Sequence, residues 1–169
     1  MEYGNKVLFE VVGEEFRKTE GEVTLPRRGD PGSAGHDFYS NEDVVIKGNR
    51  VVQLSDGEYG LKYGEHTFWT DVKVKLPEDK VMLVEVRSSI GIKYHGNIKN
   101  STGVIDASYY FNPKTDGNVG INIVNYSTED IVIKRGERIA QGLVVNYYVA
   151  EDDKPIKETR DGGTGSSGK

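Results

Sequence analysis

The sequence predicts an all-β protein, an antiparallel, jelly-roll-like sandwich or barrel with one short helix at most. Glycine (21 residues) and tyrosine (10 residues) are abundant among the 169 residues, and this composition favours strands and turns. The apolar segments are short and closely spaced, and Gly, Pro, Asn and Asp separate them. Such spacing is typical of antiparallel sheets that close into a sandwich or barrel.

Each predicted strand is a short apolar run or a run that alternates apolar and polar residues. In chain order, these strands are residues 7–12, 44–47, 51–54, 68–76, 81–87, 119–125, 131–134 and 139–148. The turn sequences GDPGSAG, SDGEYG, LPEDK and KTDGN interrupt the pattern. One helical turn is predicted at residues 88–94 (SSIGIKY), and Gly91 keeps it short.

The length fits a single domain with a usable core, which we assign to residues 1–159. Residues 160–169 are rich in Gly and Ser and cannot pack a core, so they are expected to form a flexible C-terminal segment. Only 36% of the residues are hydrophobic, which is low for a monomer of this size. Burial of apolar surface between subunits is therefore an expected arrangement.

Charge and composition also exclude several classes of function. The formal net charge of −5 disfavours a nucleic-acid binder, which needs many clustered Lys and Arg residues. The chain has no cysteine, so it has neither disulfides nor thiolate metal sites. The first residues, MEYGNKVLFEVV, lack the pattern of a signal segment, and no apolar run reaches membrane-spanning length. We expect a cytoplasmic protein.

The run Gly103-Val104-Ile105-Asp106-Ala107-Ser108-Tyr109 places a carboxylate at the end of a predicted strand. In an active-site hairpin, such a carboxylate can orient or deprotonate a water molecule. An aspartate at this position is also frequently a turn residue that accepts a hydrogen bond from its own backbone. The residues of this run alone leave both interpretations open.

Four further segments have side chains suited to chemistry. Residues 31–40 (PGSAGHDFYS) form a turn into a strand with Asp37 at the junction, and residues 86–89 (VRSS) offer a guanidinium and two hydroxyls to an anion. In residues 136–142 (GERIAQG), two polar side chains enter a strand and need partners. The Gly- and Ser-rich end of the chain can wrap phosphates with backbone N–H groups. Plain connections, a helix cap, a surface salt bridge and a linker are the structural alternatives.

The order and spacing of these five segments resemble the five motifs of the trimeric dUTPase family (dUTP nucleotidohydrolases). The resemblance runs from about Pro26 to the carboxyl end. It implies a β-clip fold and a homotrimer whose sites draw on three subunits. It also implies a hydrolase that converts dUTP to dUMP and pyrophosphate with Mg²⁺. In this family the metal is held by the triphosphate and water rather than by protein ligands.

The resemblance also assigns roles to individual residues. It implies that Asp106 activates the water that attacks the α-phosphorus and that Tyr109 packs against deoxyribose and excludes a 2′-hydroxyl. The remaining implied positions read the uracil edge (Asn100, Gly103, Val104, Ile105), contact phosphates (Arg87, Ser88, Ser89, Gln141), brace the site (Asp37, Arg138) or close over the triphosphate as a lid (Arg160, Gly165, Ser166, Ser167).

The chain also departs from the family pattern. Thr164 stands where the family usually has an aromatic that stacks on uracil. Two long segments, residues 55–68 and 110–118, look like extra surface loops and are candidate sites for a protein partner.

Three functions are therefore kept open. The first is dUTP hydrolysis, in the cytoplasm of a host if the chain is viral. The second is a dUTPase-like binding or regulatory protein that acts through its long loops. The third is a dCTP deaminase, which is disfavoured because Asn122 stands where that enzyme needs a glutamate.

Overall fold

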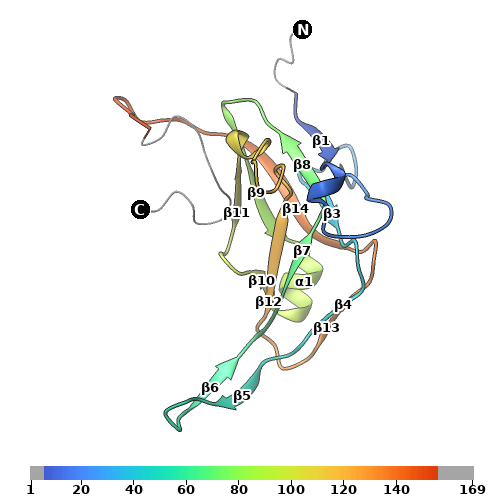
Figure 1. Ribbon diagram of the computed structural model, residues 1–169, viewed down its shortest axis with the longest axis vertical. Helices are drawn as coiled ribbons and strands as arrows, with labels where there is room; N and C mark the ends of the chain where they lie inside the picture. Colours follow the sequence, from blue (N-terminus) through green and yellow to red (C-terminus); the bar gives the residue numbers. More distant parts are fainter. Residues whose placement is uncertain (1–5, 156–169) are drawn as a thin grey trace.

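Antiparallel strands dominate the computed structural model, which describes residues 6–155 (Figure 1). The predicted all-β class with one short helix is confirmed for this part of the chain. Its elements are β1 (Leu8–Val11), the 3-10 turn η1 (Glu14–Phe16), β2 (Arg27–Arg28), β3 (His36–Tyr39), β4 (Val44–Ile46), β5 (Arg50–Gln53), β6 (Tyr59–Lys62), β7 (Gly64–Trp69), β8 (Val72–Lys75), β9 (Lys80–Val86), α1 (Ser88–Tyr94), β10 (Gly96–Ile98), β11 (Gly103–Asp106), the 3-10 turn η2 (Ala107–Tyr109), β12 (Gly120–Asn125), β13 (Ile131–Ile133) and β14 (Arg138–Asn146).

Two larger sheets and three strand pairs make up the fold. The larger sheet has the order β11-β9-β14-β3-β2, and the second has the order β10-β12-β7. The pairs are β1 with β8, β4 with β13, and β5 with β6. The strands β9 and β14 are inner strands of the larger sheet, so each has a hydrogen-bonded neighbour on both sides.

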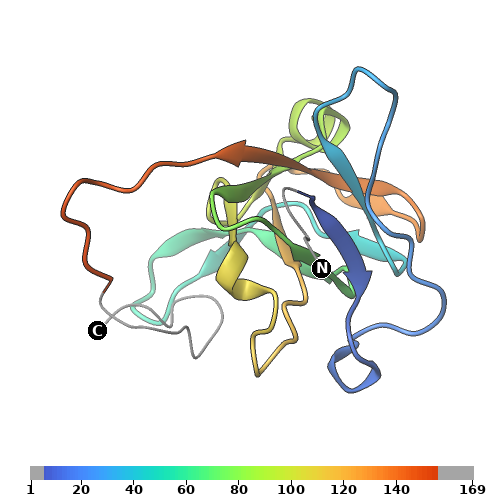
Figure 2. The ribbon, with the colours of Figure 1, turned by 90° about the horizontal axis from the view of Figure 1, so that it is seen from above.

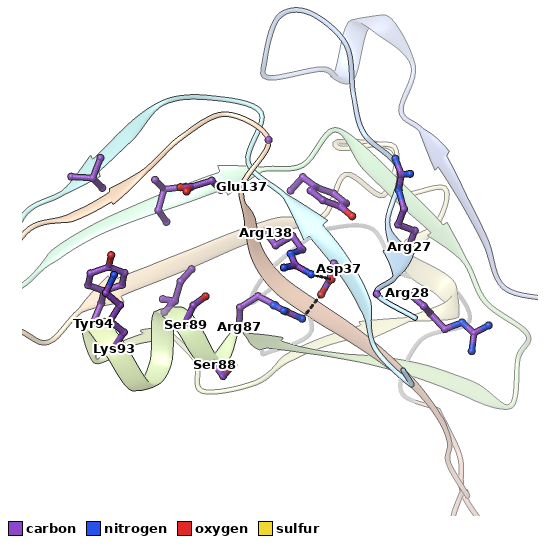
Figure 3. Close-up of a pocket in the computed structure, with 16 residues that line it drawn as sticks. Arg27, Arg28, Asp37, Arg87, Ser88, Ser89, Lys93, Tyr94, Glu137 and Arg138 are labelled. Carbon is purple, nitrogen blue, oxygen red and sulfur yellow. Dashed lines mark hydrogen bonds and ion pairs between the residues drawn. The ribbon is translucent and has the colours of Figure 1, made fainter. Parts of the chain in front are cut away.

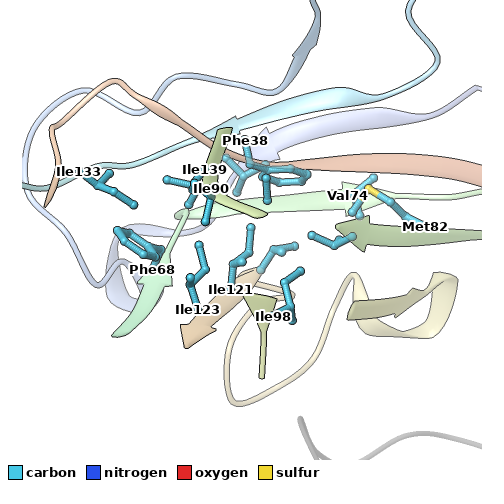
Figure 4. Close-up of a cluster of buried hydrophobic side chains, with 14 of the residues drawn as sticks. Phe38, Phe68, Val74, Met82, Ile90, Ile98, Ile121, Ile123, Ile133 and Ile139 are labelled. Atoms are coloured by element: carbon cyan, nitrogen blue, oxygen red, sulfur yellow. The ribbon is translucent and has the colours of Figure 1, made fainter. Parts of the chain in front are cut away.

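The hydrophobic core lies where the inner faces of the sheets meet (Figure 4). Alternation along the strands fills it: Met82 and Val84 of β9 are buried, as are Ile121 and Ile123 of β12. The helix α1 adds Ile90. Each fully buried side chain of this size contributes about 1.5–3 kcal/mol from the removal of apolar surface from water. The core therefore gives the strands that hold the candidate site a rigid base.

The strand predicted at residues 68–76 is wrong in one respect, because it divides at Thr70 and Asp71. Asp71 has a φ of 53°, in the left-handed region. The Thr70 hydroxyl donates to the Val119 carbonyl at 2.8 Å, and the Asp71 N–H donates to Asn118 Oδ1 at 3.0 Å. The chain thereby leaves the partner of β7, which is β12, and continues as β8 beside β1.

Residues 55–68 were predicted as a loop, and that prediction is also wrong. Residues 59–62 form β6, which pairs with β5 to make a hairpin at the lower end of the molecule in Figure 1, and β7 begins at Gly64. An Asp56-Gly57 turn closes this hairpin, with Gly57 at a φ of 87° that favours glycine. Val51 faces Leu61 across the pair, so β-branched and apolar residues stabilise strands here.

Residues 110–118 contain turns but no strand, as predicted for a loop. Seen from above (Figure 2), this gold-coloured segment lies on the same side of the molecule as the blue strand β1. Within residues 6–155, no helix is long and apolar enough to cross a membrane.

Candidate active site

A cleft of about 680 Å³ lies between β3, the start of α1 and the start of β14 (Figure 3). Five cationic and two acidic side chains line it, and we call it the cationic cleft. The charged and hydroxyl residues that line it are Arg27, Arg28, Asp37, Tyr39, Arg87, Ser88, Ser89, Lys93, Tyr94, Glu137 and Arg138. A surplus of positive charge in a chain of net charge −5 marks this cleft as a site for an anion.

Asp37 holds two of the arginines in place. Its carboxylate is buried on β3, with the side chain 3% exposed. Oδ1 accepts from Arg87 Nη1 at 2.7 Å, and Oδ2 accepts from Arg138 Nη1 at 3.2 Å. Figure 3 shows both guanidinium groups converging on this carboxylate. Because a guanidinium carries five N–H donors, each arginine keeps further donors for a ligand.

The junction between β9 and α1 brings a guanidinium and two hydroxyls together. The Arg87 N–H donates to the Ile139 carbonyl at 3.1 Å, which fixes the residue beside β14. The Arg87 carbonyl then accepts from the Ile90 N–H at 2.9 Å, and this bond starts α1. Ser88 and Ser89 are exposed in the first turn of the helix. The strand end and the helix start thus place three residues with donor groups in the lining of one cleft.

Gln141 lies beside this cleft but does not line it. In the register of the larger sheet it stands on β14 between Glu85 of β9 and Asp37 of β3. Gly35 permits this position, since a Cβ there would approach Gln141 Oε1 to 2.8 Å. The glycine of the GSAG turn therefore allows Gln141 to pack closely against the chain.

A second cleft, of about 430 Å³, lies between the β11 hairpin and the sheet β10-β12-β7, and we call it the hairpin cleft. Of the residues assigned to base and sugar, all five line it: Asn100, Gly103, Val104, Ile105 and Tyr109. Its other polar lining includes Thr67, Lys99 and Asn122. It shares no lining residue with the cationic cleft.

Asp106 ends β11 and lies next to the hairpin cleft, which its neighbour Ile105 lines. It is half-buried. It occupies the position before the η2 turn, yet its side chain makes no capping hydrogen bond there.

Asp106 and Arg87 lie at opposite ends of β9. Asp106 pairs with Val81, whereas Arg87 directly follows the last residue of the strand, Val86. Six residues of extended chain span about 20 Å. On one chain, the carboxylate and the cationic cleft are therefore well separated.

Several features of the site were not predicted from the sequence. Arg27, Arg28 and Lys93 line the cationic cleft, and Trp69 and Thr67 line the hairpin cleft. The paired arginines just before the GDPGSAG turn were the available signal for the first group. The predicted lid residues Arg160, Gly165, Ser166 and Ser167 lie outside the described residues.

The histidines fall into different environments. His66 Nε2 lies 2.8 Å from Glu42 Oε1. His36 packs against Phe9, with 5.1 Å between the ring centroids, and its burial lowers the pKa of the imidazole below the ordinary 6.5. Among residues 6–155, no three His, Cys, Asp or Glu side chains converge into a metal cage.

Taken together, the fold and its two clefts define an all-β protein with a site for a small anionic molecule. A family model for dUTPase matches residues 21–168. The chain belongs to the dUTPase family of hydrolases.

Relatives and solved structures agree with this assignment. The deoxyuridine 5'-triphosphate nucleotidohydrolase of Lactococcus lactis is 34% identical over 147 residues, which cover 86% of this chain and 89% of that protein. The enzyme of the same name from Debaryomyces hansenii is 35% identical over 161 residues, covering 91% and 86%.

The fold is likewise similar to solved dUTPases. The crystal structure of the Streptococcus mutans enzyme matches with a TM-score of 0.68 at 26% identity, covering 85% of this chain and 98% of that one. A mutant of Staphylococcus bacteriophage 80alpha dUTPase, solved with dUpNHpp, matches with a TM-score of 0.62 at 26% identity, covering 98% and 99%. These matches support the β-clip, jelly-roll-like description of the fold.

Proposed function

We propose that this chain hydrolyses dUTP to dUMP and pyrophosphate. The observation that carries the proposal is the pair of clefts: one supplies cations and hydroxyls for phosphates, and the other supplies a narrow recess with a carboxylate beside it. A nucleoside triphosphate is a molecule whose two halves need these two environments.

In this proposal, the cationic cleft binds the phosphates. Arg87 donates charge-assisted hydrogen bonds to phosphate oxygens, and the Ser88 and Ser89 hydroxyls add neutral ones. Asp37 forms ion pairs with both Arg87 and Arg138, so the Arg87 guanidinium is oriented before the substrate arrives. Gln141 supplies a further amide donor from β14. Such preorganised donors stabilise the charge that develops on the phosphates during transfer.

Asp106 acts as the general base on a water molecule. Its carboxylate takes one proton from the water as the water oxygen forms a bond to the α-phosphorus. The bond from that phosphorus to the bridging oxygen breaks, and pyrophosphate leaves with the electron pair. A half-buried carboxylate at the end of a paired strand is held firmly enough to orient the water.

The hairpin cleft binds the base and sugar. Asn100 and the backbone of residues 103–105 contact the uracil edge, and Tyr109 packs against the deoxyribose. Gly103 lies so close to Val84 that an added Cβ would be 3.1 Å from Val84 Cβ. This close approach keeps the recess narrow, which favours a pyrimidine without a 5-methyl group.

Magnesium is the cofactor that the family implies. The donors of the cationic cleft are guanidinium and hydroxyl groups, which fit phosphate oxygens rather than a metal. The ion therefore fits this chain as a partner of the triphosphate and water, where it neutralises charge and aligns the phosphates. No described residue is assigned to it as a ligand.

The distance between the clefts supports a shared site in a homotrimer. A triphosphate is too short to place its α-phosphorus at Asp106 and its outer phosphates at an Arg87 that lies about 20 Å away along the same strand. A second copy of the chain is needed to bring an Arg87 close to an Asp106. Exposed apolar side chains such as Val104, which is 54% exposed, suit such subunit contacts.

The proposal also includes a C-terminal lid and a cellular location. We assign Arg160, Gly165, Ser166 and Ser167 to a lid over the triphosphate, on the family resemblance of their sequence. We place the activity in the cytoplasm, or in the cytoplasm of the host if the chain is viral.

The regulatory alternative has one observation in its favour. On the β5–β6 hairpin, Val51, Tyr59 and Leu61 are 67%, 71% and 57% exposed. No observation favours deamination. The side chain of Asn122 is an amide, which cannot take up a proton as a glutamate does, and it donates a hydrogen bond to Thr67 Oγ1 at 2.8 Å.

The deciding experiment measures pyrophosphate and ammonia from dUTP, dTTP, dCTP and UTP in the presence of magnesium. We expect pyrophosphate from dUTP and little product from the other three. Ammonia from dCTP would establish the deaminase instead. Absence of any product from a folded chain would leave only the binding protein.

A further inference from the structure

The segment of residues 110–118, which we call the 110–118 loop, is anchored to the body of the protein. Asp116 Oδ2 accepts from Lys73 Nζ of β8 and from the Gly13 N–H, at 2.8 and 2.9 Å. Both side chains of the ion pair are mostly buried, at 13% and 14% exposure. A contact between the Tyr110 hydroxyl and Glu10 ties the loop to β1. The loop therefore has a fixed position.

The interior of the loop is also ordered by specific contacts. Asn112 is buried, and its Oδ1 accepts from the Lys114 N–H at 3.0 Å. Gly117 has a φ of 74°, and a Cβ there would lie 2.5 Å from the Tyr110 carbonyl and 2.8 Å from the Tyr109 carbonyl. Glycine is thus required where the loop closes against the η2 turn.

This loop holds the phenol of Tyr109 from two directions. The Tyr109 hydroxyl donates to the Asn118 carbonyl at 3.1 Å, and the Thr115 hydroxyl donates to the Tyr109 oxygen at 3.1 Å. The other acceptor near the Thr115 hydroxyl, Asn112 Oδ1, lies 3.3 Å away. Two hydrogen bonds at its far end fix a tyrosine ring whose near end is fixed by the backbone of η2.

We propose that Thr115 is a positioning residue that sets how closely the Tyr109 ring approaches the sugar, and thereby sets the preference for deoxyribose over ribose. This inference rests on the proposed function, since it assumes that the hairpin cleft holds the nucleoside. Discrimination against one hydroxyl group depends on a small clearance. A ring that can swivel away gives the 2′-hydroxyl room.

The test replaces the Thr115 hydroxyl and keeps the shape of the side chain. Thr115→Val removes the donor, and Thr115→Ser restores it. Lys114→Ala is the matched control on the same loop, because the bond to Asn112 uses the Lys114 backbone and leaves the side chain exposed. Each variant is prepared with 3-fluorotyrosine at position 109, and its melting temperature is measured.

Two readouts are compared: the ¹⁹F resonance of position 109, and the ratio of the affinities for dUMP and UMP measured by calorimetry. Loss of one neutral hydrogen bond should reduce this ratio about fivefold in Thr115→Val. The same variant should shift or broaden the resonance. Thr115→Ser should recover both readouts, and Lys114→Ala should change neither.

An unchanged resonance in a folded Thr115→Val protein would overturn the positioning role. A shifted resonance with an unchanged affinity ratio would overturn the role in sugar selection. Failure of the proposed function looks different: the wild-type chain would bind dUMP and UMP without preference, or would not hydrolyse dUTP.

Discussion

The cationic cleft and the hairpin cleft are built by different means. In the cationic cleft, charged side chains form most of the polar lining, and Asp37 fixes two of the five cations by direct ion pairs. In the second, a narrow strand hairpin, apolar residues and a tyrosine form the walls, and Lys99 is the one charged side chain among the described residues that line it. Charge can bind phosphates from many directions, whereas a base and a sugar are recognised by shape. Under the proposed function, this difference lets one chain carry the phosphate half and the nucleoside half of the site at separate ends of β9.

The largest expected effect separates chemistry from binding on the hairpin side. Asp106→Asn should slow pyrophosphate release by about 10³-fold, because loss of a general base commonly costs this much. Binding of a non-hydrolysable dUTP analogue should persist, since the amide keeps the shape of the side chain. A stopped assay and calorimetry measure the two quantities. The exposed Asp153→Asn is the control, and near-normal turnover in Asp106→Asn would remove Asp106 from the mechanism.

The next effect concerns the cationic cleft. Asp37→Asn should lower the free energy of unfolding by about 2 kcal/mol, less than for a fully buried pair because Arg87 and Arg138 keep contact with water. It should also raise KM for dUTP, since Arg87 loses its orientation. Urea unfolding and initial rates measure both.

The exposed pair of Glu65 and Lys99 offers a matched comparison for that variant. Glu65→Gln should leave unfolding nearly unchanged because solvent screens this pair. Equal effects of the two substitutions would show that Asp37 is an ordinary surface partner.

A smaller effect depends on pH. Burial lowers the pKa of His36 below its unfolded value of 6.5, so the folded state prefers the neutral ring. At higher pH the His36 ring is neutral in both the folded and the unfolded chain, so this residue no longer makes the free energy of unfolding depend on pH. As pH falls below about 6.5, protonation favours the unfolded chain and stability is lost.

His36→Phe should therefore flatten the decline of the melting temperature between pH 7 and pH 5. The expected change is no more than a few degrees, and the neighbouring Phe9 provides an apolar partner for the new ring. Parallel declines in the two proteins would assign the acid sensitivity to other groups.

Much of the fold followed from local sequence. The helix at Ser88–Tyr94 was predicted with its observed bounds, and most strands differ at their ends by a few residues. The two errors have different causes. Asp71 turns one predicted strand into two, and the pairing of β6 with β5 converts an apparent loop into a hairpin. The contacts of Thr70 and Asp71 join residues far apart in the sequence and leave no periodic signal, and the short β6 strand contains two polar or glycine positions that resemble a loop.

The sequence singles out candidate site residues but does not give their geometry. The family resemblance paired Asp37 with Arg138 and gave Arg87 a separate role at the phosphates, whereas the structure joins both arginines to Asp37 by ion pairs. Nothing in the spacing indicated that Asp106 lies at the far end of β9, because the register of β11 decides this. The anchoring of the 110–118 loop was also hidden, since it depends on Gly13 and Lys73.

The most direct test of the account combines two inactive variants. Arg87→Gln and Asp106→Asn chains are each purified, unfolded, mixed in equal amounts and refolded together. If every site takes Arg87 from one subunit and Asp106 from another, random assembly should restore about a quarter of the wild-type sites. We predict that the mixture hydrolyses dUTP at this level while each variant alone does not. A mixture as inactive as its components, with mixed trimers confirmed by native mass spectrometry, would contradict a site shared between subunits.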